Sequence, residues 1–147
     1  MRKVMFWMGF AAWLAILPGC DNFGDDEPIV NPQEVAQVTT HLVTGGQWRI
    51  EQFIDEGVDK TAIYASYILN FLPDGTVRLN QQTGTWQLTR DGDDVELNLL
   101  LPPVDRFAEE LNEDWDVKET SLTQMLLEDD DDDGAADRSV LKLMKIR

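Results

Sequence analysis

The pattern of apolar and polar residues changes its period once along this chain. From Trp48 onward, apolar residues tend to take every second position, which is the period of a strand with one buried face. Pro73-Asp74-Gly75 and Asp91-Gly92 are turn signals between such runs, and Pro102-Pro103 ends one of them before a predicted helical turn over residues 104–111. Strands are predicted at residues 48–54, 67–71, 77–79, 84–88, 95–101, 115–119, 122–127 and 140–146.

Strict alternation also predicts which side chains of these strands face the core. In the first strand it places Trp48, Ile50 and Ile54 together on the buried face. The same rule gives a buried row in the following strands: Tyr67, Leu69, Phe71, Val77, Leu79, Trp86, Leu88, Val95, Leu97, Leu99 and Leu101. Three arginines are expected to point outward: Arg49, Arg78 and Arg90, of which Arg49 and Arg78 have the opposite parity to the apolar row of their strand.

A helical period precedes the strands. Asn31 can cap a helix, Pro32 suits the first helical position, and Glu34 completes a capping box. Apolar residues then recur at helical spacing: Val35, Val38 and Leu42. Gly45-Gly46 ends the segment. We therefore expect a short N-terminal helix that carries the lone histidine, His41, on its surface.

Short strands joined by hairpins indicate an all-β fold with an antiparallel sheet, either a sandwich or a barrel. The barrel is favoured because closure removes exposed strand edges. A Gly-x-Trp pattern recurs at Gly46-Gln47-Trp48 and Gly84-Thr85-Trp86, and Glu113-Asp114-Trp115 keeps the tryptophan. The glycine lets a strand approach its neighbour closely, and the tryptophan fills the interior.

Several short motifs follow one another in a fixed order: Gly46-x-Trp48, Phe71-x-x-Asp74-Gly75-Thr76-Val77, Gly84-x-Trp86, Asp91-Gly92, Trp115-x-Val117 and Leu141-x-Leu143. Their order resembles that of small bacterial lipocalin-like lipoproteins, over residues 42–146. The resemblance implies an antiparallel, eight-stranded up-and-down barrel with a short N-terminal helix. It implies no particular ligand or activity.

The first twenty residues have the pattern of an export signal. Arg2 and Lys3 precede an apolar run over residues 4–17, which is shorter than the roughly 20 residues that a membrane-spanning helix needs. The run stops at Leu17-Pro18-Gly19-Cys20, which resembles the lipobox of bacterial lipoproteins, in which the cysteine becomes the lipidated first residue. We expect a signal peptide over residues 1–19, an acidic tether over 20–30 and the barrel domain over 31–147. The alternative is an ordinary signal peptide followed by an incidental cysteine, either buried or a free thiol.

Lipidation of Cys20 would attach the domain to a membrane of the bacterial cell envelope. The residues after Cys20 leave the choice of membrane open, because an acidic stretch there resembles a surface-export signal in some bacteria. In others, an aspartate directly after the cysteine, as at Asp21, resembles a signal for inner-membrane retention. The outer membrane or the cell surface is favoured over the inner membrane.

Composition narrows the classes of function. The chain has 28 acidic and 12 basic residues, a net charge of −16, and cleavage before Cys20 would leave 10 basic residues and a charge of −18. A surface this acidic argues against nucleic-acid binding. The single cysteine excludes an intrachain disulfide, and one histidine with one cysteine excludes the usual zinc ligand sets. We predict no cofactor, no metal and no catalytic residue, and hence a non-enzyme. We also expect a monomer.

One acidic run has the start of a calcium-binding pattern. Asp129, Asp131 and Asp133 alternate along the chain and Gly134 follows them, as in the first half of a calcium loop. The match fails at the twelfth position, where Val140 stands in place of a bidentate glutamate. A solvated hairpin loop is the favoured interpretation of the Asp129–Asp133 run, and weak calcium binding stays open.

Three tryptophans of the predicted domain are candidate ligand-binding residues: Trp48, Trp86 and Trp115. Aromatic walls suit apolar ligands, but the interior of an eight-stranded barrel is narrow enough to be filled by its own side chains. Two functions therefore stay open, ahead of a third and least favoured one, an enzyme or inhibitor active at the cell surface. One is a membrane-anchored barrel that binds a small apolar or amphipathic ligand. The other is a structural or interaction lipoprotein of the envelope, with a filled barrel and a protein partner.

Overall fold

The computed structural model describes residues 32–129 and 138–146. In chain order its elements are α1 (Pro32–Val43), β1 (Gln47–Asp55), β2 (Val58–Asp59), the 3-10 helix η1 (Thr61–Tyr64), β3 (Ile68–Phe71), β4 (Thr76–Leu79), β5 (Gln82–Asp91), β6 (Asp94–Leu100), the 3-10 helix η2 (Ala108–Leu111), β7 (Asp114–Thr120), β8 (Gln124–Asp129) and β9 (Ser139–Ile146). The predicted signal peptide, Cys20, the tether and residues 130–133 of the acidic run lie outside the described ranges. Within these ranges, no helix has the length and apolar character needed to cross a membrane.

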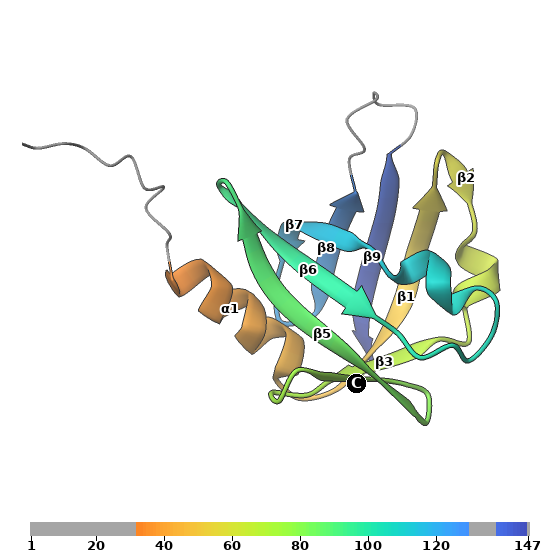
Figure 1. Cartoon of the computed structure of the whole chain (residues 1–147), viewed down its shortest axis with the longest axis horizontal. Coiled ribbons are helices and arrows are strands. Elements are labelled where there is room, and N and C mark those ends of the chain that lie inside the picture. Colours follow the sequence, from red (N-terminus) through yellow and green to blue (C-terminus); the bar gives the residue numbers. More distant parts are fainter. Residues whose placement is uncertain (1–31, 130–137, 147) are drawn as a thin grey trace, which may run out of the picture.

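Neighbouring strands pair antiparallel, and the sheet closes on itself. The strands follow one another in chain order from β3 to β9, and β9 pairs back with β1 from Gln47↔Ile146 to Ile54↔Val140. The ring built by the described residues has eight strands, because β2 only adds two residues beside the end of β1. The predicted all-β fold and its eight-stranded up-and-down order are confirmed (Figure 1).

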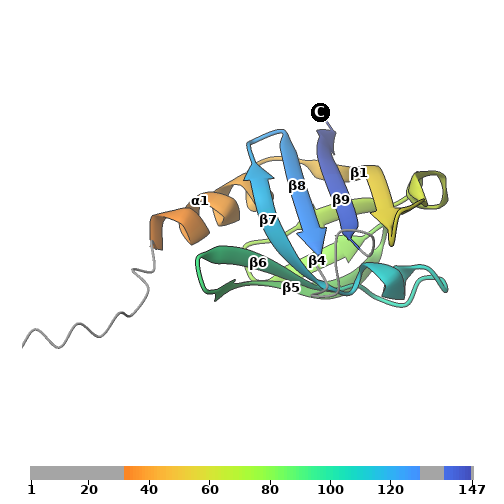
Figure 2. The same ribbon diagram turned by 90° about the horizontal axis from the view of Figure 1, so that it is seen from above.

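The loops gather at two opposite ends of the barrel. At one end α1 lies beside the tips of two hairpins (Figure 2): Glu34 pairs with Arg90 at the end of β5, and the His41 ring contacts Thr120 at the end of β7. At the other end the tip of β1 meets η1, η2 and the start of β9, where Ser139 donates a hydrogen bond to Asp55. We call these the α1 end and the η end.

Helix α1 forms where the capping pattern predicts it, with Pro32 as its first residue. Val38 and Leu42 are buried, 2% and 0% exposed, so the helix covers the α1 end of the core with one apolar face. The indole of Trp48 donates a hydrogen bond to the Leu42 carbonyl, 3.0 Å away. This bond satisfies one of the carbonyls that the end of a helix leaves without an intrahelical donor.

A β-bulge overturns part of the predicted face of β1. The pairing with β9 shifts between Ile50 and Gln52, so Glu51 is an extra residue in β1. Trp48 and Ile50 point inward as predicted, but Phe53 is fully buried and Ile54 lies half-buried on the outer side. The predicted placement of Ile54 in the core is therefore wrong, because one extra residue exchanges the two faces of the strand.

Two further predictions need correction. The strand predicted over residues 122–127 begins at Gln124, because residues 121–123 form the turn after β7 and Leu122 is 52% exposed. Arg49 and Arg78 are exposed as predicted, whereas the Arg90 side chain is only 15% exposed and pairs with Glu34 of α1. Arg90 has the same parity as Trp86 and Leu88 and is opposite the buried Val95, so it lies on the inner face at the α1 end of the barrel.

Candidate binding surfaces

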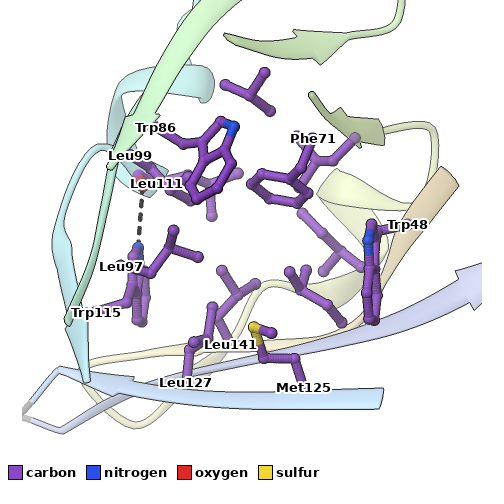
Figure 3. Packing of buried hydrophobic residues seen from close by; sticks show 14 of the residues in the cluster. Trp48, Phe71, Trp86, Leu97, Leu99, Leu111, Trp115, Met125, Leu127 and Leu141 are labelled. Atoms are coloured by element: carbon purple, nitrogen blue, oxygen red, sulfur yellow. Dashed lines mark hydrogen bonds between the residues drawn. The ribbon is translucent and has the colours of Figure 1, made fainter. Parts of the chain in front are cut away.

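The three candidate tryptophans all lie in the barrel interior, on different walls (Figure 3). Trp48 comes from β1, Trp86 from β5 and Trp115 from β7. The ring of Trp86 meets Phe71 edge to face at 5.9 Å between centroids, and Trp115 meets Phe53 at 6.2 Å. The structure thus brings the tryptophans into one core, each against a different neighbour.

Each indole nitrogen in this core has a partner within the protein. The Trp48 N–H donates to the carbonyl of Leu42 at 3.0 Å, that of Trp86 to Leu72 at 3.0 Å, and that of Trp115 to Leu111 at 3.1 Å. Because the N–H is the one polar group of a tryptophan side chain, none of the three offers a free donor to a ligand in the interior.

The centre of the barrel is filled by side chains. Trp48 and Trp115 are 0% exposed, and Trp86 is 8% exposed. A void large enough for a water molecule would give the side chains that line it some accessible surface, so no such void touches Trp48 or Trp115. Further residues at 0% exposure surround them: Leu69, Val77, Leu79, Leu97, Leu127, Leu141 and Leu143.

A polar cluster closes the barrel at the η end. The Lys60 ammonium lies 2.5 Å from an Asp55 carboxylate oxygen and 2.9 Å from one of Glu110. The buried Tyr64 donates its hydroxyl to the same Glu110 oxygen at 2.7 Å, and Ser139 donates to Asp55 at 3.0 Å. These bonds join β1, η1, η2 and β9 over one opening of the ring.

The electrostatics of this cluster indicate a structural clasp. The hydrogen bond from Tyr64, followed by the one from Lys60, holds the pKa of Glu110 below its usual range. The hydrogen bonds to Asp55 and Glu110 raise the pKa of Lys60 to about 12, and burial raises the pKa of Tyr64. Each group therefore keeps one protonation state around neutral pH, whereas a general acid or base needs a pKa near its working pH.

Within residues 32–129 and 138–146, no three or more histidine, cysteine, aspartate and glutamate side chains cluster in a way that could hold a metal ion.

His41 is half-buried, and its Nδ1 lies 3.0 Å from the Thr120 hydroxyl, so it joins α1 to β7. Most of the calcium-like Asp129–Asp133 run lies outside the described residues, and the calcium interpretation stays a prediction.

A groove of about 340 Å³ crosses the outer face of four strands. Its lining is mainly polar, and Leu126 of β8 supplies apolar surface. The lining includes Gln52, Glu119, Ser121, Gln124, Leu126 and Lys142. Sequence reasoning missed this groove. Strict alternation from Trp48 and from Trp115 predicts that Gln52 and Glu119 face the core. Two bulges make these side chains face outward instead, and no residue typical of turns marks the bulges in the sequence of β1 or β7.

A second groove, of about 400 Å³ and mainly apolar, lies beside Gly84 and the end of β6. A Cβ at Gly84 would lie 2.2 Å from the Leu100 carbonyl oxygen, so only glycine permits this close approach of β5 and β6. This confirms the prediction that Gly84 lets its strand approach a neighbour closely. Leu100 is 61% exposed beside it.

No protein-family model matches the chain, and no curated protein matches it. Among solved structures, a lipocalin-like protein from Bacteroides uniformis ATCC 8492 is similar in fold. The match covers 72% of this chain and 99% of that chain, at 17% sequence identity and a TM-score of 0.44. A likeness at this level says nothing about ligand or activity.

Proposed function

We propose that this chain is a lipoprotein of the bacterial cell envelope that acts through contacts on the outside of a filled barrel. The observation that carries the proposal is the interior. Trp48 and Trp115 are fully buried, and the three indole N–H groups already have partners within the chain. A ligand would have to displace packed side chains before it found space there.

The membrane anchor is part of this proposal and is supported by the sequence. The apolar run over residues 4–17 leads to Leu17-Pro18-Gly19-Cys20, and α1 begins twelve residues after the cysteine, at Pro32. Acyl chains on Cys20 would hold the barrel at an envelope membrane, with each buried CH₂ contributing about 0.8 kcal/mol. We place the protein at the outer membrane or the cell surface.

Replacement of Cys20 tests the anchor. The natural chain, expressed in a bacterium fed an alkyne fatty acid, should carry the label and sediment with membranes. Cys20→Ser should lose the label and should no longer sediment with membranes. Asn22→Ser, two residues further on, should behave as the natural chain does. Membrane attachment by Cys20→Ser without a label would contradict lipid anchoring.

Native mass spectrometry tests the filled interior. The full chain, extracted from envelopes in mild detergent, should have the mass of the acylated protein with no further small molecule. The other candidate function, an apolar ligand held among Trp48, Trp86 and Trp115, requires a bound molecule that organic solvent releases. Recovery of such a molecule in a fixed ratio to the protein would overturn the filled barrel.

A further inference from the structure

We propose that the groove across the outer face of β7, β8, β9 and β1 binds an extended peptide segment that carries one acidic and one basic side chain. The inference rests on the proposed function, because it names the part of the outer surface through which the barrel makes contact. Its elements are one row of side chains, two bulges at the level of that row, and a set of polar groups without partners.

Four of the lining side chains form a single row across the strands. Gln52 of β1 is opposite Lys142 of β9, Lys142 is opposite Leu126 of β8, and Leu126 is opposite Glu119 of β7. The residues next to them on β8 and β9, Met125, Leu127, Leu141 and Leu143, are buried, so the row faces outward.

Two β-bulges produce this row. The register of β1 shifts between Ile50 and Gln52, and that of β7 shifts between Val117 and Glu119. Without the extra residues, Gln52 and Glu119 would continue the inward series of their strands and would bury polar groups in an apolar core. Both bulges lie beside the row, and each turns a polar side chain into the same groove, which is a known use of bulges next to binding sites.

Four polar side chains of the groove have no partners in the part of the chain that the structure describes. No hydrogen bond or ion pair within it involves the side chains of Gln52, Glu119, Gln124 or Lys142. Charged residues just outside the groove are paired: Arg49 with Glu51 at 2.7 Å, and Lys118 with Asp116 at 2.9 Å. The groove therefore holds an ammonium, a carboxylate and two amides that a ligand can engage.

The spacing of these groups fits an extended peptide. Lys142 and Glu119 are two strands apart, roughly 10 Å, with the half-buried Leu126 between them. An extended chain advances about 3.3 Å per residue and points successive side chains to opposite faces. Residues i and i+4 therefore share a face about 13 Å apart, and long acidic and basic side chains reach both charges from there. The amides of Gln52 and Gln124 can donate to and accept from a peptide main chain, and Leu126 offers an apolar contact between the charges.

Amide chemical shifts of the full chain, nitrogen-15-labelled in detergent micelles, test the inference. The probe is the capped peptide Glu-Ala-Leu-Ala-Lys, in which Glu, Leu and Lys share one face of the extended chain. It should shift the backbone amides of Gln52, Glu119, Gln124 and Lys142, and leave the three indole N–H signals unchanged. The capped peptide Gln-Ala-Leu-Ala-Gln should bind more weakly. Lys142→Met and Glu119→Gln should each weaken binding about twofold to fivefold, the effect of one half-exposed ion pair. Arg49→Gln, outside the groove on β1, should bind as the natural chain does.

The possible failures separate the two proposals. Shifts of the indole signals without shifts in the groove would overturn both the peptide site and the filled barrel. No shift anywhere, or binding of the charged peptide that neither Lys142→Met nor Glu119→Gln weakens, would overturn the peptide site alone. In those cases the anchored, filled barrel stands on its own tests, which are lipid labelling at Cys20 and native mass spectrometry.

Discussion

The ammonium nitrogen of Lys145 lies 4.4 Å from the centroid of the Trp48 ring. The same nitrogen donates a hydrogen bond to the carbonyl of His41 at 3.0 Å, and another to that of Thr44. One residue of the last strand thus holds the end of α1 and a core tryptophan of the first strand together. Burial lowers the pKa of Lys145, and the cation–π contact and the two hydrogen bonds oppose this effect by stabilising the charged ammonium.

Lys145→Met should lower the free energy of unfolding by about 1 kcal/mol, because it removes a cation–π contact and a cation at a helix C-terminus. Urea denaturation measures the change, and hydrogen exchange should speed up most at the last turn of α1. Lys142→Met on the same strand is the matched control, and its effect should stay within about 0.5 kcal/mol. Equal losses in the two variants would contradict the role given to Lys145.

The bulge in β1 predicts that truncation of two adjacent residues destabilises the protein by very different amounts. Phe53→Ala should destabilise the protein by about 3–5 kcal/mol, because it empties a fully buried site beside Trp115. Ile54→Ala should cost about 1 kcal/mol, since Ile54 is half-buried on the outer side. Urea denaturation of both variants decides between this register and strict alternation, which would reverse the order.

Gly84→Ala should destabilise the barrel by about 1–3 kcal/mol, because the added methyl group would overlap the backbone of β6 at Leu100. Gly92→Ala separates this steric effect from that of backbone conformation. Gly92 has a φ of +57°, and no atom lies within 4 Å of the added Cβ. Gly92→Ala should therefore destabilise the barrel by about 1 kcal/mol, the cost of a left-handed backbone conformation for a residue with a Cβ. In thermal unfolding, Gly84→Ala should have a lower melting temperature than Gly92→Ala. The reverse order would contradict the close approach of β5 and β6.

The clasp at the η end predicts a loss of stability in acid. The pKa of Glu110 in the folded chain lies below its ordinary value of 4.5. Its contribution is therefore present above pH 4.5 and is lost as the pH falls through the folded pKa. Glu110→Gln should lower the unfolding free energy at neutral pH and should weaken its decline in acid.

Urea denaturation between about pH 3 and pH 7 measures this dependence. A part of the decline should remain in Glu110→Gln, because Tyr67 also holds the pKa of Asp105 below its usual range. Glu109→Gln is the control, since Glu109 is exposed and its side chain takes no part in the clasp. An unchanged acid decline in Glu110→Gln would show that Glu110 does not carry it.

Much of the fold could be predicted from local pattern. The strand from Val95 to Leu99 alternates without a break, and its three apolar side chains are buried as predicted. The Asp91-Gly92 turn and the capping pattern before α1 also mark their elements correctly. Such features depend on neighbours in the chain, and local sequence therefore contains the information that sets them.

The candidate surface could not be predicted in this way. Gln52 and Glu119 belong to the outer groove only because each follows a bulge, and a bulge is decided by the pairing of two strands. The ion pair of Arg90 with Glu34 similarly depends on a helix that precedes Arg90 by more than forty residues. Alternation within one strand contains no information on either contact.

The sequence by itself determined the number of strands in the ring, most of their buried faces, the N-terminal helix and the tryptophans of the interior. Periodicity and turn chemistry are local, and burial of an apolar face enforces them. Only the tertiary structure decided the register in which β9 pairs with β1, that Glu51 is an extra residue, and that Gln52, Lys142 and Glu119 share one groove. Register and closure arise from hydrogen bonds between strands distant in the chain, which no single segment encodes.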